Sequence, residues 1–180
     1  MGRHLIHWPE RYDPSRAPVH VSNEILVPAP PEAVWEWLVR APLWPSWYPN
    51  ASGVVLAGGA GELGPGISFT WRTFGVAIRS TVLEFEPCTR IAWNAFGVGI
   101  DAYHAWLLTP KAGGTRVLTE ETQYGFAARL GALVLPKRMW TGHQLSLERL
   151  GAKAAGGDTL SQGQAGGPTL DPSSRERGDP

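Results

Sequence analysis

The sequence contains a single cysteine, Cys88, in 180 residues. One thiol excludes both an internal disulfide and a thiolate metal cluster. Cys88 lies in the segment Glu86-Pro-Cys-Thr89, which is typical of a turn, and nothing in the sequence places a base beside it. We therefore interpret Cys88 as an ordinary thiol rather than a nucleophile, which would need a positioned base.

The chain also lacks an excess of either charge. Lys plus Arg and Asp plus Glu number 16 each, so no net field attracts nucleic acid or an anionic membrane surface. No apolar run approaches the ~20 residues of a membrane-spanning helix, and the start of the chain has no apolar signal-peptide core. We expect a cytoplasmic protein without a nucleic-acid partner and without stable membrane insertion.

Sequence patterns for metal and nucleotide binding are missing as well. His4, His7 and His20 lie in or beside an irregular N-terminal segment, and no helix carries a His-x-x-x-His pattern. The glycines between Gly58 and Gly66 lie between predicted strands, where they indicate a hairpin rather than a phosphate-binding loop. The sequence therefore predicts no metal and no cofactor.

Tryptophan, by contrast, is abundant, with nine residues. Each tryptophan brings a large apolar surface and one N–H group that needs a partner. A chain of this length is typical of one domain, so we expect one site. The tryptophans either line the walls of a cavity or fill the core.

Composition divides the chain into three segments. Residues 1–19 contain Pro9, Pro14 and Pro18 and show no periodicity, which predicts an irregular arm along the surface. Residues 20–153 carry all the periodic patterns and form the predicted domain. Residues 154–180 contain almost nothing apolar from Gly156 onward and are predicted to be disordered, because burial cannot offset the entropy of ordering them.

The predicted elements of the domain follow the order strand, two helices, six strands, long helix. The first strand is His20–Val27, a helix follows from Pro30 to Arg40, and the aromatic and proline-rich residues 42–49 form a short second helix or turn. The six strands are separated by glycine and proline turns, which is typical of an antiparallel meander. Their predicted ranges are Val54–Ala57, Ile67–Thr73, Val76–Glu86, Arg90–Phe96, Ile100–Thr109 and Thr115–Tyr124.

The last predicted element is a helix from Ala127 to Lys153, kinked at Pro136. Its apolar residues follow helical spacing and form one stripe, on which Met139 and His143 also lie. The stripe consists of Leu133, Pro136, Trp140, Leu147 and Leu150.

Several segments resemble the START-like (SRPBCC) superfamily of polyketide cyclases, dehydrases and lipid-transport proteins. Val27-Pro-Ala-Pro-Pro-Glu-Ala-Val-Trp35 is similar to its strand-to-helix entry, and Trp44-Pro-Ser-Trp-Tyr-Pro49 is similar to its Trp-Pro-x-Trp corner. The strand signatures that match are Val82-Leu-Glu-Phe-Glu-Pro87, Ile91-Ala-Trp93, His104-Ala-Trp-Leu-Leu-Thr-Pro110 and Gly114-Thr-Arg-Val-Leu-Thr-Glu-Glu-Thr122.

The resemblance implies an α+β helix-grip fold, in which a curved antiparallel sheet of about seven strands wraps around the C-terminal helix and leaves a cavity between them. It also implies which strand faces turn inward. These carry Ala102, His104, Trp106 and Leu108 on one strand, and Val117, Thr119, Glu121 and Gln123 on the next.

A hairpin at Ala112-Gly113-Gly114 that pairs Trp106 with Thr119 also sets His104 opposite Glu121. A His–carboxylate pair on an apolar wall can act as a general acid or base, so His104 and Glu121 are the candidate catalytic residues. The alternative is a satisfied structural pair, and a register slip of one residue would separate the two side chains.

The candidate ligand-binding residues surround that pair. Trp71, Trp93, Trp106 and Trp140 are the aromatic residues expected nearest the cavity, with core filling as the alternative. Thr119, Met139 and His143 complete the set. Arg72 and Arg79 could bind an anionic group of a ligand, but strand arginines usually face solvent, and we expect that here.

Three functions remain open at this stage. The first is binding or transport of a small hydrophobic molecule, such as a lipid, an isoprenoid or an aromatic polyketide-like compound. The second is a cyclase or dehydratase in which His104 and Glu121 move protons. The third is an interaction module like the co-chaperone branch of the superfamily. The sequence leaves ligand identity and oligomeric state open.

Overall fold

A computed structural model of the chain describes residues 6–134 and 137–156. The elements appear in the predicted order, preceded by a short 3-10 helix in the N-terminal arm. The helices are η1 (Glu10–Tyr12), α1 (Pro31–Val39), η2 (Ala41–Ser46), η3 (Ala57–Gly59), α2 (Phe126–Val134) and α3 (Arg138–Ala155). The strands are β1 (Val19–Val27), β2 (Ala51–Leu56), β3 (Ser68–Thr73), β4 (Val76–Glu86), β5 (Arg90–Gly97), β6 (Ile100–Lys111) and β7 (Gly114–Tyr124).

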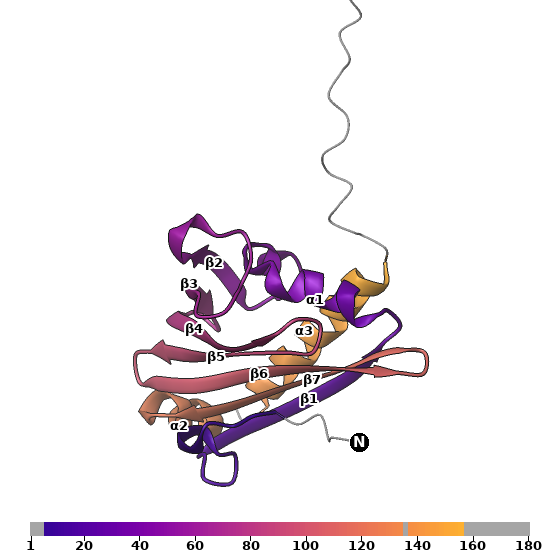
Figure 1. Cartoon of the computed structure of the whole chain (residues 1–180). Coiled ribbons are helices and arrows are strands. Elements are labelled where there is room, and N and C mark those ends of the chain that lie inside the picture. The colour runs from indigo at the N-terminus through magenta and orange to yellow at the C-terminus, as the bar shows by residue number, and fades with distance from the viewer. Residues whose placement is uncertain (1–5, 135–136, 157–180) are drawn as a thin grey trace, which may run out of the picture.

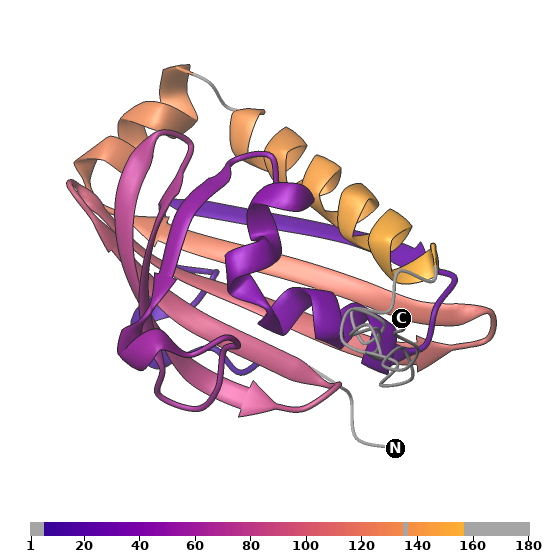
Figure 2. The same ribbon diagram turned by 90° about the horizontal axis from the view of Figure 1, so that it is seen from above.

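All seven strands form one antiparallel sheet in the order β1-β7-β6-β5-β4-β3-β2. The strands β2 to β7 form a meander, and the last of them, β7, pairs with the first strand of the chain, β1. The two edge strands of the sheet are therefore β1 and β2 (Figure 1). The helix α3 lies across the concave face of the curved sheet, with α1 and η2 beside it and α2 at one end (Figure 2). The predicted α+β helix-grip fold is confirmed.

The core is densest where the segment Trp44 to Tyr48 meets the sheet. Trp44 is fully buried, its indole N–H donates to the Leu38 carbonyl over 2.9 Å, and its ring lies 5.2 Å from that of Trp71 and 5.3 Å from that of Trp93. Pro42 and Pro45 of η2 hold the chain in a stiff corner, so the aromatic rings pack in fixed positions. Side chains fill this part of the core, which we call the solid end of the concave face.

The convex face of the sheet carries a second, smaller core. Tyr12 of the arm stacks on Tyr103 of β6 with 5.3 Å between ring centroids, and Ala92 and Ala105 are buried beneath them. The Tyr12 hydroxyl donates to Asp101, and Arg11 forms an ion pair with the same carboxylate. The described part of the arm thus packs on the convex face, and β6 is buried on both of its faces.

The expected long helix is two helices. α2 ends at Val134 and α3 begins at Arg138, and Pro136, where we expected a kink, lies outside the described residues. Gly125, at φ 102°, joins β7 to α2, and a Cβ at this position would collide with the Gly99 carbonyl oxygen. Only glycine allows α2 to start this close to the β5–β6 turn.

The split also breaks the predicted apolar stripe. Leu147 and Leu150 of α3 are buried, whereas Leu133 of α2 is 80% exposed and Trp140, in the first turn of α3, is 49% exposed. Helical spacing aligns these residues only within one continuous helix that is covered along its whole length. None of the helices that the structure describes is both long enough and apolar enough to span a bilayer.

Candidate functional site

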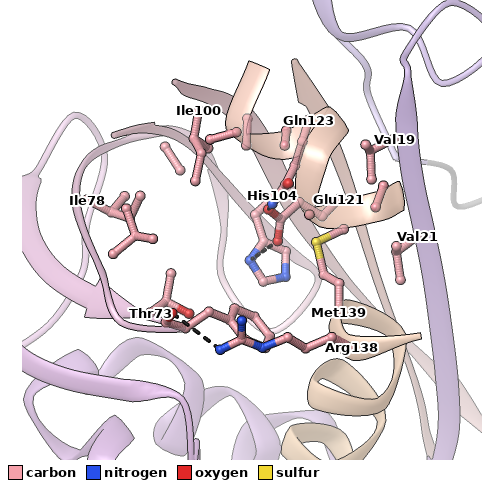
Figure 3. A pocket seen from close by; sticks show the side chains of 18 of the residues that line it. Val19, Val21, Thr73, Ile78, Ile100, His104, Glu121, Gln123, Arg138 and Met139 are labelled. Atoms are coloured by element: carbon pink, nitrogen blue, oxygen red, sulfur yellow. Dashed lines mark hydrogen bonds and ion pairs between the residues drawn. The ribbon is translucent and has the colours of Figure 1, made fainter. Parts of the chain in front are cut away.

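A cavity of about 190 Å³ lies between the concave face of the sheet and the helices α2 and α3. Its walls are mainly apolar, with a polar group formed by His104, Glu121 and Gln123 on the sheet and with Thr73 and Arg138 also in the lining (Figure 3). α2 contributes only small residues to the lining, namely Ala127, Ala128, Gly131 and Ala132. The sheet and α3 supply Val19, Val21, Trp71, Thr73, Val76, Ile78, Trp93, Ala95, Ile100, Ala102 and Met139 among others.

The cavity exists because inward-facing side chains change size along β5 and β6. Near α2 the facing residues are Ala95 and Ala102, which leave space above the sheet. The next inward pair, Trp93 with His104, forms the end wall, and beyond it Ile91 faces Trp106 in the solid core. The volume of the side chains at paired positions therefore determines where the cavity lies between the sheet and the helices.

The predicted register between β6 and β7 is the one observed. Trp106 pairs with Thr119, and His104 pairs with Glu121. The His104 Nδ1 atom lies 3.5 Å from Glu121 Oε2, and both residues line the cavity. In Figure 3 the two side chains point toward one another inside the pocket.

Further contacts hold this pair in place. His104 Nε2 lies 2.8 Å from the Thr119 hydroxyl, which in turn donates to the Ala105 carbonyl over 3.3 Å. Gln123 donates to Glu121 Oε1 over 2.5 Å. One oxygen of the carboxylate and one nitrogen of the imidazole are thereby engaged, which leaves Glu121 Oε2 and His104 Nδ1 facing each other.

A second imidazole joins the group from α3. The ring of His143 stacks on that of His104 with 4.9 Å between centroids and 8° between planes, and its Nε2 lies 3.2 Å from Glu121 Oε2. Apart from this approach to Glu121, neither ring nitrogen of His143 has a polar partner among the described residues, although the side chain is 1% exposed. His104, Glu121 and His143 could together hold a metal ion, since one donor atom from each lies within 4.8 Å of the others.

Burial controls the ionisation of this group. It lowers the pKa of His104, against the raising effect of Glu121, and His143 lowers it further. Burial alone raises the pKa of Glu121, but the positive charge of protonated His104 and contacts from His143 and Gln123 act in the opposite direction and lower it. Burial is the largest of these influences on His104, so the neutral imidazole is its favoured form.

The predicted ligand-binding residues either line the cavity, are buried behind its wall or, in one case, lie half exposed on α3. Trp71, Trp93 and Met139 line the cavity. Trp106, Thr119 and His143 are buried behind its wall, where Trp106 and His143 pack against His104 and Thr119 hydrogen-bonds it.

The expectation that Trp140 lies next to the cavity is wrong, because Trp140 does not line it. It lies half exposed in the first turn of α3, where no neighbouring element among the described residues covers that side of the helix. Arg72 and Arg79 are exposed, in agreement with the expectation for strand arginines.

Other lining residues were not selected from the sequence. Tyr48 is 2% exposed and lines the cavity, and burial raises the pKa of its hydroxyl, so it stays protonated. The signal for Tyr48 was the aromatic and proline-rich segment 42–49, which we interpreted only as a short second helix or turn. Ala95 and Ala102 carry no chemical signal, yet their small size creates the space.

This arrangement can bind an apolar molecule on its aromatic and aliphatic walls and can contact a polar substituent through the histidine and glutamate side chains. The comparisons with known proteins agree with that capacity in general terms. The family described as polyketide cyclase / dehydrase and lipid transport matches residues 18–155. The comparison with curated proteins gave no match.

Solved structures with the same fold come from several bacteria. The hypothetical protein jhp0584 from Helicobacter pylori is 30% identical, with a TM-score of 0.78 over 83% of this chain and 96% of that one. TTHA0849 from Thermus thermophilus is 18% identical, with a TM-score of 0.64 over 78% of this chain and 100% of that one. The di-domain ARO/CYC protein StfQ of the steffimycin biosynthetic pathway is also 18% identical, with a TM-score of 0.61 over 76% of this chain and 50% of that one.

Proposed function

The chain belongs to the polyketide cyclase / dehydrase and lipid transport family, and from that premise we propose that it binds a small, ring-shaped apolar molecule that carries an oxygen substituent. The observation that carries this proposal is a mainly apolar cavity with a buried His104–Glu121 pair in its wall. Family membership supports a role on a hydrophobic ligand, and the geometry narrows the kind of ligand.

Cavity size supports a ring compound over a long lipid. An engineered apolar cavity of about 150 Å³ accepts benzene, whereas sites for drug-sized ligands span roughly 300–1,000 Å³. At about 190 Å³, the cavity fits one or two fused rings. The indoles of Trp71 and Trp93 in the lining offer flat faces for such rings.

The polar groups of the wall support an oxygen substituent on that ring. Tyr48, Gln123 and Arg138 are among the residues that line the cavity, and each side chain carries an O–H or N–H group that can donate a hydrogen bond. A ligand oxygen that accepts such a bond gains about 0.5–1.5 kcal/mol. A fully apolar ligand cannot make this bond.

The proposal is tested by native mass spectrometry of the purified full-length chain and by calorimetric titration with 2-naphthol and naphthalene. We expect one 2-naphthol per chain and weaker binding of naphthalene, which lacks the oxygen. Ala102→Leu fills the cavity floor and should weaken 2-naphthol binding at least tenfold. Ala77→Leu, on an exposed position of β4, is the matched control and should bind like the wild type. Absence of binding by the folded wild type, or equal binding by Ala102→Leu, contradicts the proposal.

A second candidate function is ring closure with loss of water on the bound molecule. It is favoured by the position of His104 and Glu121, which lie in the cavity wall rather than deep in the core and can contact a carbonyl group there. StfQ and BexL, which share the fold, are described as ARO/CYC proteins. Incubation with a linear poly-β-ketone thioester tests this function. Products lighter by one water should form with the wild type and not with His104→Ala, while 2-naphthol binding persists; equal turnover by both proteins rules out the role of His104.

A further inference from the structure

Three buried donor groups from three different elements meet at one point of the cavity wall. They are His104 on β6, Glu121 on β7 and His143 on α3, with exposed fractions of 2%, 8% and 1%. His104 and Glu121 are neighbours across a strand pair, but His143 reaches them from the separate helix α3. Only the folded chain brings this group together.

The distances within the group are those between ligands of one metal ion. Bonds of about 2.0–2.1 Å in a tetrahedral zinc site separate neighbouring ligand atoms by roughly 3.4 Å. Glu121 Oε2 lies 3.5 Å from His104 Nδ1 and 3.2 Å from His143 Nε2, which gives two edges of such a tetrahedron. The donor atoms all lie within 4.8 Å of one another, so the third edge is complete once the two imidazole nitrogens approach by at most about 1.4 Å.

Supporting contacts fix the orientation of two of the three groups. Thr119 gives its hydroxyl proton to the Ala105 carbonyl, so the proton of the neutral His104 ring lies on Nε2, which donates to the Thr119 oxygen. Gln123 binds the Oε1 atom of Glu121. Metal-binding histidines and carboxylates are usually held in this way by a second set of hydrogen bonds.

That hydrogen-bond pattern leaves one acceptor atom, His104 Nδ1, facing another, Glu121 Oε2. With the proton on Nε2, the lone pair of His104 Nδ1 points toward the carboxylate oxygen of Glu121. Apart from the approach of Nε2 to Glu121, the nitrogens of His143 have no polar partner among the described residues, although this side chain is almost fully buried. A single cation between the three groups bonds to all of them once the two imidazole rings, which are stacked 8° from parallel, tilt so that the lone pairs of both rings point to it.

We propose that His104 Nδ1, Glu121 Oε2 and His143 Nε2 bind one divalent transition-metal ion at the wall of the cavity. Two imidazoles and one carboxylate suit zinc, iron or cobalt in preference to calcium or magnesium, which prefer all-oxygen sites. Three protein ligands leave further positions open, as in catalytic rather than structural metal sites. His104 and Glu121 line the cavity, so an open position there can accept an oxygen atom of the bound molecule.

The test uses Co²⁺ as the probe on the full-length chain after removal of metals with a chelator. Co²⁺ in a site with few ligands gives strong absorption bands in the visible range, and elemental analysis of the dialysed protein gives the stoichiometry. We expect one ion per chain with such bands. His143→Asn and Glu121→Gln should each weaken Co²⁺ binding at least a hundredfold, and Thr119→Val, which frees the His104 ring, should weaken it roughly 10–100-fold.

His7→Asn is the matched control, because this imidazole is on the surface, 66% exposed, and should not change the spectrum or the stoichiometry. Circular dichroism checks that each variant is folded. Absence of stoichiometric Co²⁺ and Zn²⁺ binding by the folded wild type overturns the proposal whatever the variants do. Binding that is unchanged in folded His143→Asn overturns it as well.

Titration of the metal-free wild type with 2-naphthol separates this proposal from the proposed function. If 2-naphthol binds and Co²⁺ does not, the metal site is refuted and the ligand cavity stands. If Co²⁺ binds as expected and 2-naphthol does not, the metal site stands and the ring-binding function is refuted.

Discussion

The two ends of the concave face are built on the same strands and differ in almost everything else. At the end covered by α1 and η2, Trp44 packs against Trp71 and Trp93 and leaves no space. At the end covered by α2, Ala95 faces Ala102 and the cavity opens above them. The sheet supplies the same spacing at both ends, so the volume of the side chains decides which part holds the fold together and which part receives a ligand.

The covering elements differ in the same sense. η2 places its largest side chain inward, since Trp44 is fully buried. α2 places small residues over the cavity and turns large ones outward, with Phe126 at 70% and Leu133 at 80% exposure. Few buried contacts hold α2, which predicts that stability is concentrated in the solid end.

Trp44→Ala gives the largest expected effect and tests the solid end. Removal of a fully buried indole and its hydrogen bond to Leu38 should lower the free energy of unfolding by about 3–5 kcal/mol. Urea unfolding followed by circular dichroism measures the change. A loss below about 1 kcal/mol would mean that the aromatic cluster is not the main support of the fold.

The same substitution at the two ends sharpens the comparison. Ala41→Leu adds three carbon atoms to a fully buried position near Trp44, and such overpacking should cost about 1–3 kcal/mol. Ala95→Leu adds the same atoms to the cavity and should change the free energy of unfolding by less than about 1 kcal/mol, because space is available there. Equal losses in urea unfolding would show that the cavity end tolerates no more volume than the solid end.

Leu133→Ala gives the smallest expected effect. The side chain is exposed on α2, so its removal should change the free energy of unfolding by less than about 0.5 kcal/mol. The measurement is the same urea titration, with Leu147→Ala as the control. Leu147 is fully buried on α3, and its loss should cost about 2–5 kcal/mol. Similar losses for both variants would place α2 within the main cooperative unit.

Local patterns predicted the sheet well. β4 has the predicted bounds Val76–Glu86, because its turns are marked by Phe74-Gly75 and Glu86-Pro87. A hairpin that pairs Trp106 with Thr119, together with the inward faces that the family resemblance implies, placed His104 opposite Glu121, and the observed register is that one rather than the alternative shifted by one residue. These features depend on residues close in sequence or on alternation, which a sequence displays directly.

Features that depend on distant elements could not be predicted in the same way. His143 and Glu121 are 22 residues apart and lie on α3 and β7, so their 3.2 Å contact depends on how α3 packs against the sheet. Trp140 fits the helical period of Leu147, but burial needs a covering neighbour as well as the right angle. The space at Ala95 and Ala102 required the strand pairing to be known first.

The arm on the convex face has a consequence for where the folding unit starts. The family match begins at residue 18, but Tyr12, six residues earlier, covers Tyr103, and Asp101 on β6 binds both Tyr12 and Arg11. A fragment trimmed to the matched segment would expose the apolar patch formed by Ala92, Tyr103 and Ala105. Copies of such a fragment would aggregate through this patch. The N-terminal boundary of the family match and the N-terminal boundary needed for a soluble fragment therefore fall at different residues in this protein.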